Sequence, residues 1–303
     1  MQTAKEAEGR RSTPAQSLDD RRSLSTLPGP IFPMINPREP ERLWHIWPDI
    51  KCDIIAINYI GLRKTPQMLA RARVQGIKEA LNYDGKVIST LVGDNWELER
   101  TPVKEYASDI DQMGFDFGTT HDDYVYPDDN ISIQWDRIQS MLARADSLAS
   151  YDPDPGLIGI VQGSTSQQIR FEMVELEKLG IERMALPCAD SLQKKSYRGI
   201  VDFLRIGGEL GAWRWLMGIN SISEMLRFNA DGLSGYGWCY RAAKGQIYRG
   251  SKLVRPRSSG FCSHAACKAN AWRGLTLEEQ YSRHNMLTWL EVNDRLGGNE
   301  TLE

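Results

Sequence analysis

Two cysteines and two histidines lie close together near the end of the chain, and their side chains are common metal ligands. The whole sequence contains five cysteines and four histidines. Cys262, His264 and Cys267 form a C-x-H-x2-C run, and His284 follows within residues 278–292. Four thiolate and imidazole ligands suit tetrahedral zinc, and four protein ligands leave no open position for a substrate. The pattern therefore predicts a structural Zn2+ site.

The alternative interpretation is a buried pair of free cysteines with two unrelated histidines. His284 lies within EEQYSRHNMLTWLEV, residues 278–292, an amphipathic stretch that predicts a helix. Such a helix can project the imidazole back onto the C-x-H-x2-C knuckle, which favours zinc. Because the cysteine number is odd and shows no tight framework, we expect reduced or metal-bound thiols rather than a disulfide scaffold.

A second group of residues that could bind a ligand is basic. The run YRAAKGQIYRGSKLVRPRSSG, residues 240–260, contains no acidic side chain. The run is compatible with a solvated loop or with a surface that contacts nucleic-acid phosphates. The formal net charge of −3 argues against indiscriminate nucleic-acid binding. The six candidate phosphate ligands are Arg241, Lys244, Arg249, Lys252, Arg255 and Arg257.

The elements that must position these groups belong to an ordinary soluble globular chain. It has 303 residues, of which 41% are hydrophobic and 25% charged. No stretch approaches the ~20 apolar residues that span a bilayer, and the first residues lack the apolar core of a signal peptide. We therefore expect a cytoplasmic protein with no membrane partner. Residues 1–28 are polar and predict a disordered tail.

From Ile31 onward, short apolar runs alternate with longer amphipathic segments, such as the predicted helix TPQMLARARVQGIKEAL at 65–81. This alternation is typical of parallel α/β folds, and seven or eight units in one domain favour a closed (β/α)8 TIM barrel. We assign the barrel to 29–258 and a zinc knuckle with a C-terminal helix to 259–303. The predicted strands include DIIAIN, KVISTLV, FDFGTT, LIGIVQG, RMALP, WRWLMGI and ADGLSGYGW.

Several segments, in order, resemble the tRNA-guanine transglycosylase superfamily, the zinc-bearing barrels that exchange guanine in nucleic acid for a 7-deazaguanine base. GIVQGSTSQQIR at 159–170 resembles the glycine-rich strand end of that family, with Ser164 in place of a second glycine. MGFDFGTTHDD at 113–123 resembles the archaeal-type segment whose last aspartate recognises the base. INYIGLRKTPQMLARARVQGIKEALNYDGKVIST is similar to the family's Asn-x-Tyr strand and helix. The zinc segment resembles C-x-C-x2-C…HN, with His264 replacing the middle cysteine, and the likeness covers about residues 50–290.

The resemblance implies a base-recognition site at two strand ends. The recognising aspartate falls on Asp122, whose carboxylate can accept both of the adjacent N–H groups of a purine-like base. Gln162 would bind the carbonyl of the base, and Gly163 would leave room for it. Alternatively, THDD is only an acidic loop with His121 as a bystander.

Three other side chains lie near the same predicted rim. Asp94 and Asp123 are spare carboxylates that could act as general acid or base. Cys188 also follows a strand, and we interpret it as a buried small apolar residue.

Two departures from the family pattern concern the chemistry itself. The first aspartate of the family's D-S-G-G-F-Q motif falls on Thr90, and its nucleophilic aspartate falls on Ser234. A hydroxyl without a neighbouring base supplies neither the charge nor the nucleophilicity that an oxocarbenium-like sugar needs. Asp231, which we place at the end of the same strand, could replace it if the glycine-rich turn GLSGYG shifts. Otherwise Asp231 is a structural carboxylate that caps nearby amides.

The leading hypothesis is a transglycosylase that exchanges guanine for a preQ0-type 7-deazaguanine in DNA or in tRNA. DNA is favoured, as in the DpdA-type branch, because no separate RNA-binding domain follows before Glu303. The alternative is a non-catalytic base- or nucleic-acid-binding subunit, for which the heterodimeric eukaryotic queuine enzyme is the precedent. We therefore expect either a homodimer or a catalytic partner subunit. A third interpretation is an unrelated zinc-bearing barrel.

Overall fold

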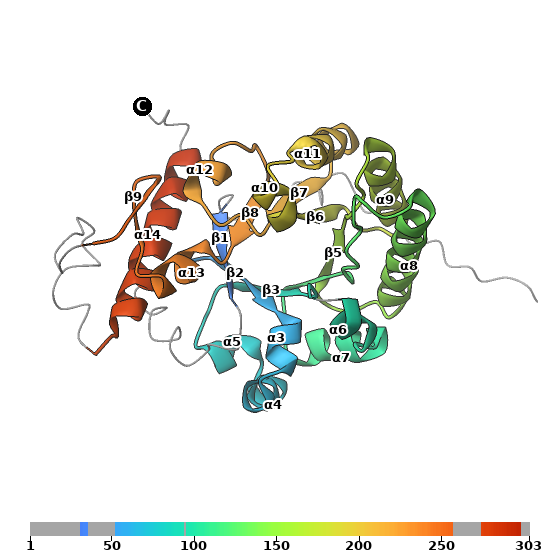
Figure 1. The fold of residues 1–303 in the computed structure, drawn as a ribbon. Coiled ribbons are helices and arrows are strands. Elements are labelled where there is room, and N and C mark those ends of the chain that lie inside the picture. Colours follow the sequence, from blue (N-terminus) through green and yellow to red (C-terminus); the bar gives the residue numbers. More distant parts are fainter. Residues whose placement is uncertain (1–30, 36–51, 94, 257–273, 298–303) are drawn as a thin grey trace, which may run out of the picture.

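The protein folds into a closed barrel of eight parallel strands, as seen in a computed structural model that describes residues 31–35, 52–93, 95–256 and 274–297 (Figure 1). The strands pair in sequence order, and β1 closes the ring by pairing with β8, Phe32 opposite Ser234. This confirms the predicted (β/α)8 barrel. The barrel strands are β1 (Ile31–Ile35), β2 (Ile54–Asn58), β3 (Lys86–Thr90), β4 (Phe117–Thr119), β5 (Gly156–Ile160), β6 (Arg183–Pro187), β7 (Trp213–Met217) and β8 (Gly232–Gly235).

Helices cover the outside of this barrel, and a short hairpin and a long helix follow its last strand (Figure 1). The hairpin consists of β9 (Ile247–Arg249) and β10 (Lys252–Val254). The helices are α3 (Tyr59–Arg63), α4 (Pro66–Gln75), α5 (Ile77–Leu81), α6 (Asn95–Glu99), α7 (Val103–Gln112), α8 (Ile131–Ser150), α9 (Ser166–Lys178), α10 (Ala189–Gln193), α11 (Arg198–Leu210), α12 (Ile222–Met225), α13 (Gly237–Ala243) and α14 (Leu277–Gly297).

Side chains fill the interior of the barrel, so it is a packed core rather than a pore. Alternate residues of each strand point inward, as expected for the two-residue period of a strand. The rings of Phe32 and Trp215 lie 5.1 Å apart between their centroids. The buried cluster around these rings is Phe32, Met34, Ile54, Ala56, Ile88, Ile158, Ile160, Ala185, Trp215 and Met217 from the strands, with Met141 from α8.

Local sequence signals set where several helices begin and end. Thr165 and Gln168 form a reciprocal capping box at the start of α9, and Asn130 caps α8. The predicted helix over 65–81 is interrupted, because Gly76 has φ +91° and separates α4 from α5. The break lets Ile77 N donate to Met113 O at 2.7 Å, which fastens α5 to the end of α7.

The predicted C-terminal helix is present as α14, beside β1, β9 and α13 (Figure 1). Asn285 on this helix joins three backbone segments. Its Oδ1 accepts from Tyr248 N at 2.9 Å, and its Nδ2 donates to Trp238 O at 3.0 Å and Gln246 O at 3.1 Å. In the described part of the chain, no helix combines the length and apolarity needed to cross a membrane.

Some of the predicted features fall on residues outside the described ranges. They are the tail at 1–28, one spare carboxylate, one basic residue of the 240–260 run, and the three ligands of the C-x-H-x2-C knuckle. Beyond the tail, these residues are Asp94, Arg257, Cys262, His264 and Cys267.

Candidate functional site

Two of the predicted recognition residues meet at the carboxyl end of the barrel. Asp122 follows β4 and Gln162 follows β5, and these strands are neighbours in the sheet. Both side chains are buried, with 4% and 6% of the residue exposed. Gln162 Nε2 donates a hydrogen bond to Asp122 Oδ1. The carboxylate and the amide therefore form one polar unit at the end of the barrel where TIM-barrel active sites lie.

A third member of this unit, Glu172, was not predicted from the sequence. It lies on α9 and is 1% exposed. Its carboxylate accepts from Gly163 N at 2.7 Å and from Gln162 N at 3.1 Å. A sequence signal existed, because Glu172 shares the apolar face of α9 with Ile169 and Leu176, at helical spacing. An acidic residue on a buried helix face needs a partner, and here the partner is the β5 strand end.

Burial makes both carboxyl groups of this unit weak acids. Desolvation raises the pKa of Asp122 to about 7, although the hydrogen bond from Gln162 opposes the shift. Desolvation raises the pKa of Glu172 to about 8, against two backbone N–H donors, and the neighbouring Asp122 charge adds to the rise. Asp122 is therefore poised to change its charge near neutral pH, which is a common property of functional carboxylates.

The predicted role of Gly163, to leave room for a base, has a competing structural explanation. A Cβ at this position would lie 2.6 Å from Ile169 N and 2.8 Å from Glu172 Oε2. The glycine is therefore required by the close approach of the β5 end to α9. Ser164, which follows, donates from its hydroxyl to Gln134 Oε1 at 2.8 Å, so it also belongs to this packing.

The loop after β4 places three more polar residues around Asp122. Tyr124 donates its hydroxyl to Asp190 on α10, which ties this loop to the β6 strand end. Asp123 is half-buried, and desolvation raises its pKa. His121 is buried with its Nε2 3.2 Å from Thr101 O, and desolvation lowers its pKa to about 4, so the ring is neutral at pH 7. The bystander interpretation of His121 fits this position.

The two positions that depart from the family pattern both lie within barrel strands. Thr90 ends β3, where its hydroxyl donates to Ile57 O at 3.1 Å. Ser234 is fully buried in β8, and its Oγ accepts from Trp215 Nε1 at 2.8 Å. Cys188 is also buried, as predicted, and its Sγ lies 2.9 Å from Met217 O. Ser234 is therefore a buried hydrogen-bond acceptor for an indole N–H.

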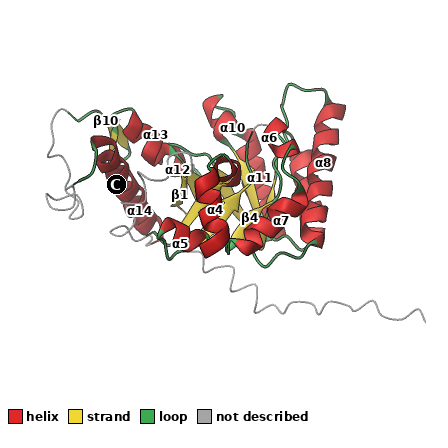
Figure 2. Ribbon diagram, turned by 90° about the horizontal axis from the view of Figure 1, so that it is seen from below, coloured by secondary structure: helices red, strands yellow, loops and turns green. Residues whose placement is uncertain are grey.

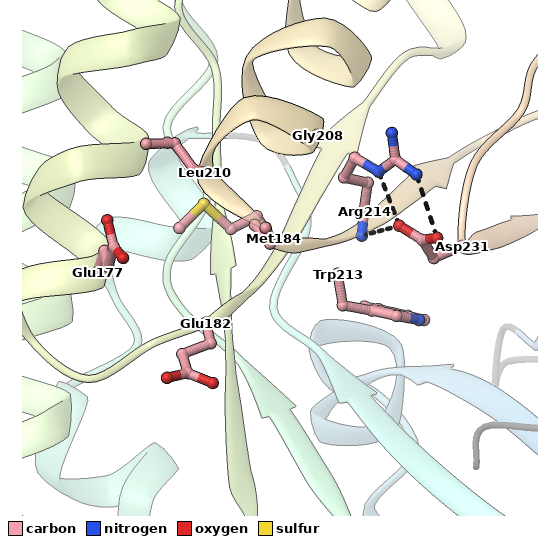
Figure 3. A pocket seen from close by; sticks show the side chains of 10 residues that line it. Glu177, Glu182, Met184, Gly208, Leu210, Trp213, Arg214 and Asp231 are labelled. Atoms are coloured by element: carbon pink, nitrogen blue, oxygen red, sulfur yellow. Dashed lines mark hydrogen bonds and ion pairs between the residues drawn. The ribbon is translucent and has the colours of Figure 1, made fainter. Parts of the chain in front are cut away.

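The predicted placement of Asp231 at the end of its strand is wrong. The segment GLSG is β8 itself, so Asp231 precedes the strand and lies at the amino-terminal end of the barrel. There its carboxylate accepts from Arg214 N at 2.9 Å and Arg214 Nε at 2.7 Å (Figure 3). Asp231 and Asp122 therefore lie at opposite ends of the barrel. The carboxylate has the structural role that was the alternative interpretation.

A cavity of about 360 Å³ lies at this amino-terminal end, between α9, α11 and the starts of β6 and β7. Figure 3 shows the Arg214–Asp231 pair on one side of it and Glu177 on the other. The amino-terminal end of a TIM barrel is its stability face. We therefore separate this cavity from the Asp122 site.

We expect Asp231→Ala to lower stability without changing any binding at the Asp122 site. The substitution leaves the Arg214 backbone N–H, Nε–H and Nη2–H without their acceptor, while Nη1 keeps Leu204 O. The loss costs about 1–3 kcal/mol. Urea unfolding measures the first effect, and titration with a guanine-like base measures the second. Asp231→Asn, which keeps one acceptor oxygen, should lose less stability. A loss of base binding in a folded Asp231→Ala protein would contradict the structural role.

The predicted phosphate ligands that the structure describes lie on one segment beyond the barrel. Arg241 and Lys244 lie at the end of α13, and Arg249 and Lys252 face each other across the β9–β10 hairpin. Arg255 follows the hairpin and is exposed. The structure thus brings these five basic residues into one region.

His284, the one predicted zinc ligand within the described residues, is buried on α14. Its Nε2 lies 2.7 Å from Tyr248 O. Because a carbonyl only accepts, Nε2 is the donor of this bond. Metal-bound histidines commonly donate their other N–H to such a carbonyl. The described ranges contain no group of three or more metal-ligating side chains.

Comparison with known proteins adds no family assignment to this geometry. No protein-family model matches the chain, and none of the curated proteins matches it.

Proposed function

We propose that this protein binds a guanine-like base at the carboxyl end of its barrel, as a non-catalytic base-binding counterpart of the transglycosylases it resembles. The observation that carries the proposal is the buried Asp122–Gln162 pair. Guanine and 7-deazaguanines present two adjacent N–H donors beside one carbonyl. An ionised Asp122 accepts from both donors, and the Gln162 amide donates to the carbonyl.

Two further observations support binding rather than base exchange by this chain. Ser234 holds the position of the family's nucleophile, and its oxygen accepts the Trp215 N–H inside the barrel. Asp231 bonds to Arg214 at the opposite end. Covalent glycosyl transfer needs a carboxylate or an equally competent nucleophile against the sugar. In this proposal the protein binds the base, and a catalytic partner subunit carries out the transfer.

A second candidate, exchange of guanine for a preQ0-type base by this chain alone, is favoured by one residue. Asp123 is half-buried next to Asp122, and it is a carboxylate at the correct end of the barrel. A base-exchange assay with guanine-containing DNA and tRNA tests this candidate. Incorporation of the deazaguanine that disappears in Asp123→Ala would establish it, in place of the non-catalytic role.

The proposed zinc belongs to the same scheme as a structural ion. Cys262, His264, Cys267 and His284 would hold it, and a four-ligand Zn2+ supplies rigidity rather than reactivity. The Nε2–H bond of His284 to Tyr248 is compatible with ligation through Nδ1. In this scheme the ion would join α14 to the segment that follows the basic hairpin.

The pH dependence of base binding tests the proposed function. The ionised form of Asp122 accepts the two N–H groups, and its pKa is raised to about 7. We therefore expect affinity for 7-cyano-7-deazaguanine to rise from pH 5.5 and to level off above about pH 7.5. Below the pKa the dissociation constant should increase by up to about tenfold per pH unit. Isothermal titration calorimetry across this range is the measurement.

The control for this titration is Asp122→Asn, whose residual binding should not vary with pH in the same range. Adenine is the matched ligand, because it offers no carbonyl to Gln162 and no N–H pair to Asp122. Equal binding of both bases, or affinity that falls as the pH rises, would exclude the proposed recognition mode.

A further inference from the structure

The basic region beyond the barrel carries an exposed aromatic ring. Tyr240 lies on α13, and 49% of the residue is exposed. Arg241 Cζ lies 5.7 Å from the centroid of its ring, and Lys244 Nζ lies 4.1 Å from it. Lys244 also donates a hydrogen bond to the Tyr240 hydroxyl. The ring is thus held at the surface beside two cations instead of in the apolar core.

The neighbouring hairpin adds cations that have no acidic partner among the described residues. Arg249 lies opposite Lys252 across the β9–β10 pair, and both side chains are exposed. Within the described ranges, Arg249, Lys252 and Arg255 make no ion pair. By contrast, surface arginines elsewhere, such as Arg170 and Arg205, are paired with Glu209. The charge of the hairpin is therefore available to an anionic partner.

The ring and the hairpin are fixed to one support. Asn285 on α14 bonds to the backbone of α13 at Trp238, of the connecting turn at Gln246, and of β9 at Tyr248. Figure 2 shows α13 and β10 beside α14, toward the same end of the barrel as α6 and α10. Helices α6 and α10 follow the carboxyl ends of β3 and β6. The helix and the hairpin that carry the basic residues therefore lie toward the end of the barrel that contains Asp122.

We propose that Tyr240 stacks on a base of single-stranded nucleic acid while Arg249, Lys252 and Arg255 contact its phosphates. Cations alone would suit any polyanion, whereas an exposed ring near them can also stack on an unstacked base, and this combination favours a single strand. Stacking accepts every base, so the surface is independent of sequence. The choice of a single strand rests on the proposed function, because a base that enters the barrel has left its duplex.

Fluorescence anisotropy with a labelled dT dodecamer tests this surface in the full-length protein. We expect Tyr240→Ala to weaken binding about tenfold, and Tyr240→Phe to bind within about twofold of the wild type, because the ring is retained. The salt dependence should be unchanged in Tyr240→Ala. In Arg249→Ala/Lys252→Ala, the slope of log K against log salt should fall by about 1.4, since two phosphate contacts are lost.

Two control variants and two alternative ligands make the outcome decisive. Tyr151→Ala, which removes an equally exposed tyrosine from the end of α8, should bind the dodecamer like the wild type. Wild-type affinity of Tyr240→Ala would overturn the proposal, as would equal binding of a duplex or of polyglutamate. The dodecamer contains no guanine, so Asp122→Asn should bind it normally. Failure of base recognition and failure of strand binding are therefore distinguishable.

Discussion

Asp122→Asn is expected to weaken binding of a guanine-like base about 100-fold at pH 8. At this pH the wild-type carboxyl group, with a pKa of about 7, is mainly ionised. The substitution preserves the volume and one acceptor oxygen, but it places an NH2 group against an N–H of the base. Two hydrogen bonds to a charged group contribute about 1.5–3 kcal/mol each. Loss of one bond, with N–H repulsion at the same position, and weakening of the other give the expected factor. Calorimetric titration measures it.

The loss should not arise from unfolding, because the ionised Asp122 side chain itself costs native-state stability. Its folded pKa lies above its ordinary value of 3.8. The contribution of Asp122 to the free energy of unfolding is therefore greatest at low pH and falls as the pH rises toward about 7. The neutral amide introduced by Asp122→Asn avoids this cost, and at pH 8 we expect the variant to be at least as stable as the wild type. Asp123→Asn is the matched control for charge. A similar loss of affinity in that variant would show a general electrostatic effect rather than recognition.

The barrel could be predicted from the sequence because its signal is periodic and repeated. Runs such as RMALP and WRWLM correspond to β6 and β7, and the helices between strands have the expected spacing. Each unit satisfies the same rule independently, so one misplaced boundary leaves the fold class unchanged. Gly76 illustrates the limit, since the apolar pattern continues across it while its positive φ ends one helix and begins another.

A site residue could be placed from the sequence only where it directly follows a clearly predicted strand. Asp122 and Gln162 follow adjacent strands, so the parallel topology alone brings them together. To place Asp231, one must know where β8 begins, and a glycine-rich segment does not define that position. A shift of one strand length moves a side chain from one end of the barrel to the other. Its true partner, Arg214, lies on β7, and no local pattern links the two. Pairings between distant segments depend on register, which local sequence does not specify.

Glu172→Ala is expected to produce the largest loss of stability among the substitutions considered, about 2–6 kcal/mol near pH 5. The variant leaves the N–H groups of Gln162 and Gly163 buried without an acceptor, and each such group costs about 1–3 kcal/mol. The folded pKa of Glu172, about 8, exceeds its ordinary value of 4.5. Its contribution to stability is therefore full below about pH 4.5 and declines as the pH rises through 8, so the difference between variant and wild type should shrink at pH 8.

Urea unfolding at pH 5 and pH 8 measures both parts of this expectation. Glu175→Ala is the matched control, because Glu175 lies on the same helix but pairs with exposed Lys178, and its loss should cost less than about 0.5 kcal/mol. A Glu172 effect that is equal at both pH values would mean that the pKa of Glu172 is not raised in the folded protein. Because the same amides belong to Gln162 and Gly163, loss of Glu172 should also weaken base binding at Asp122. The helix residue thereby couples the stability of the β5 end to recognition, which explains why an acidic side chain occupies the buried face of this helix.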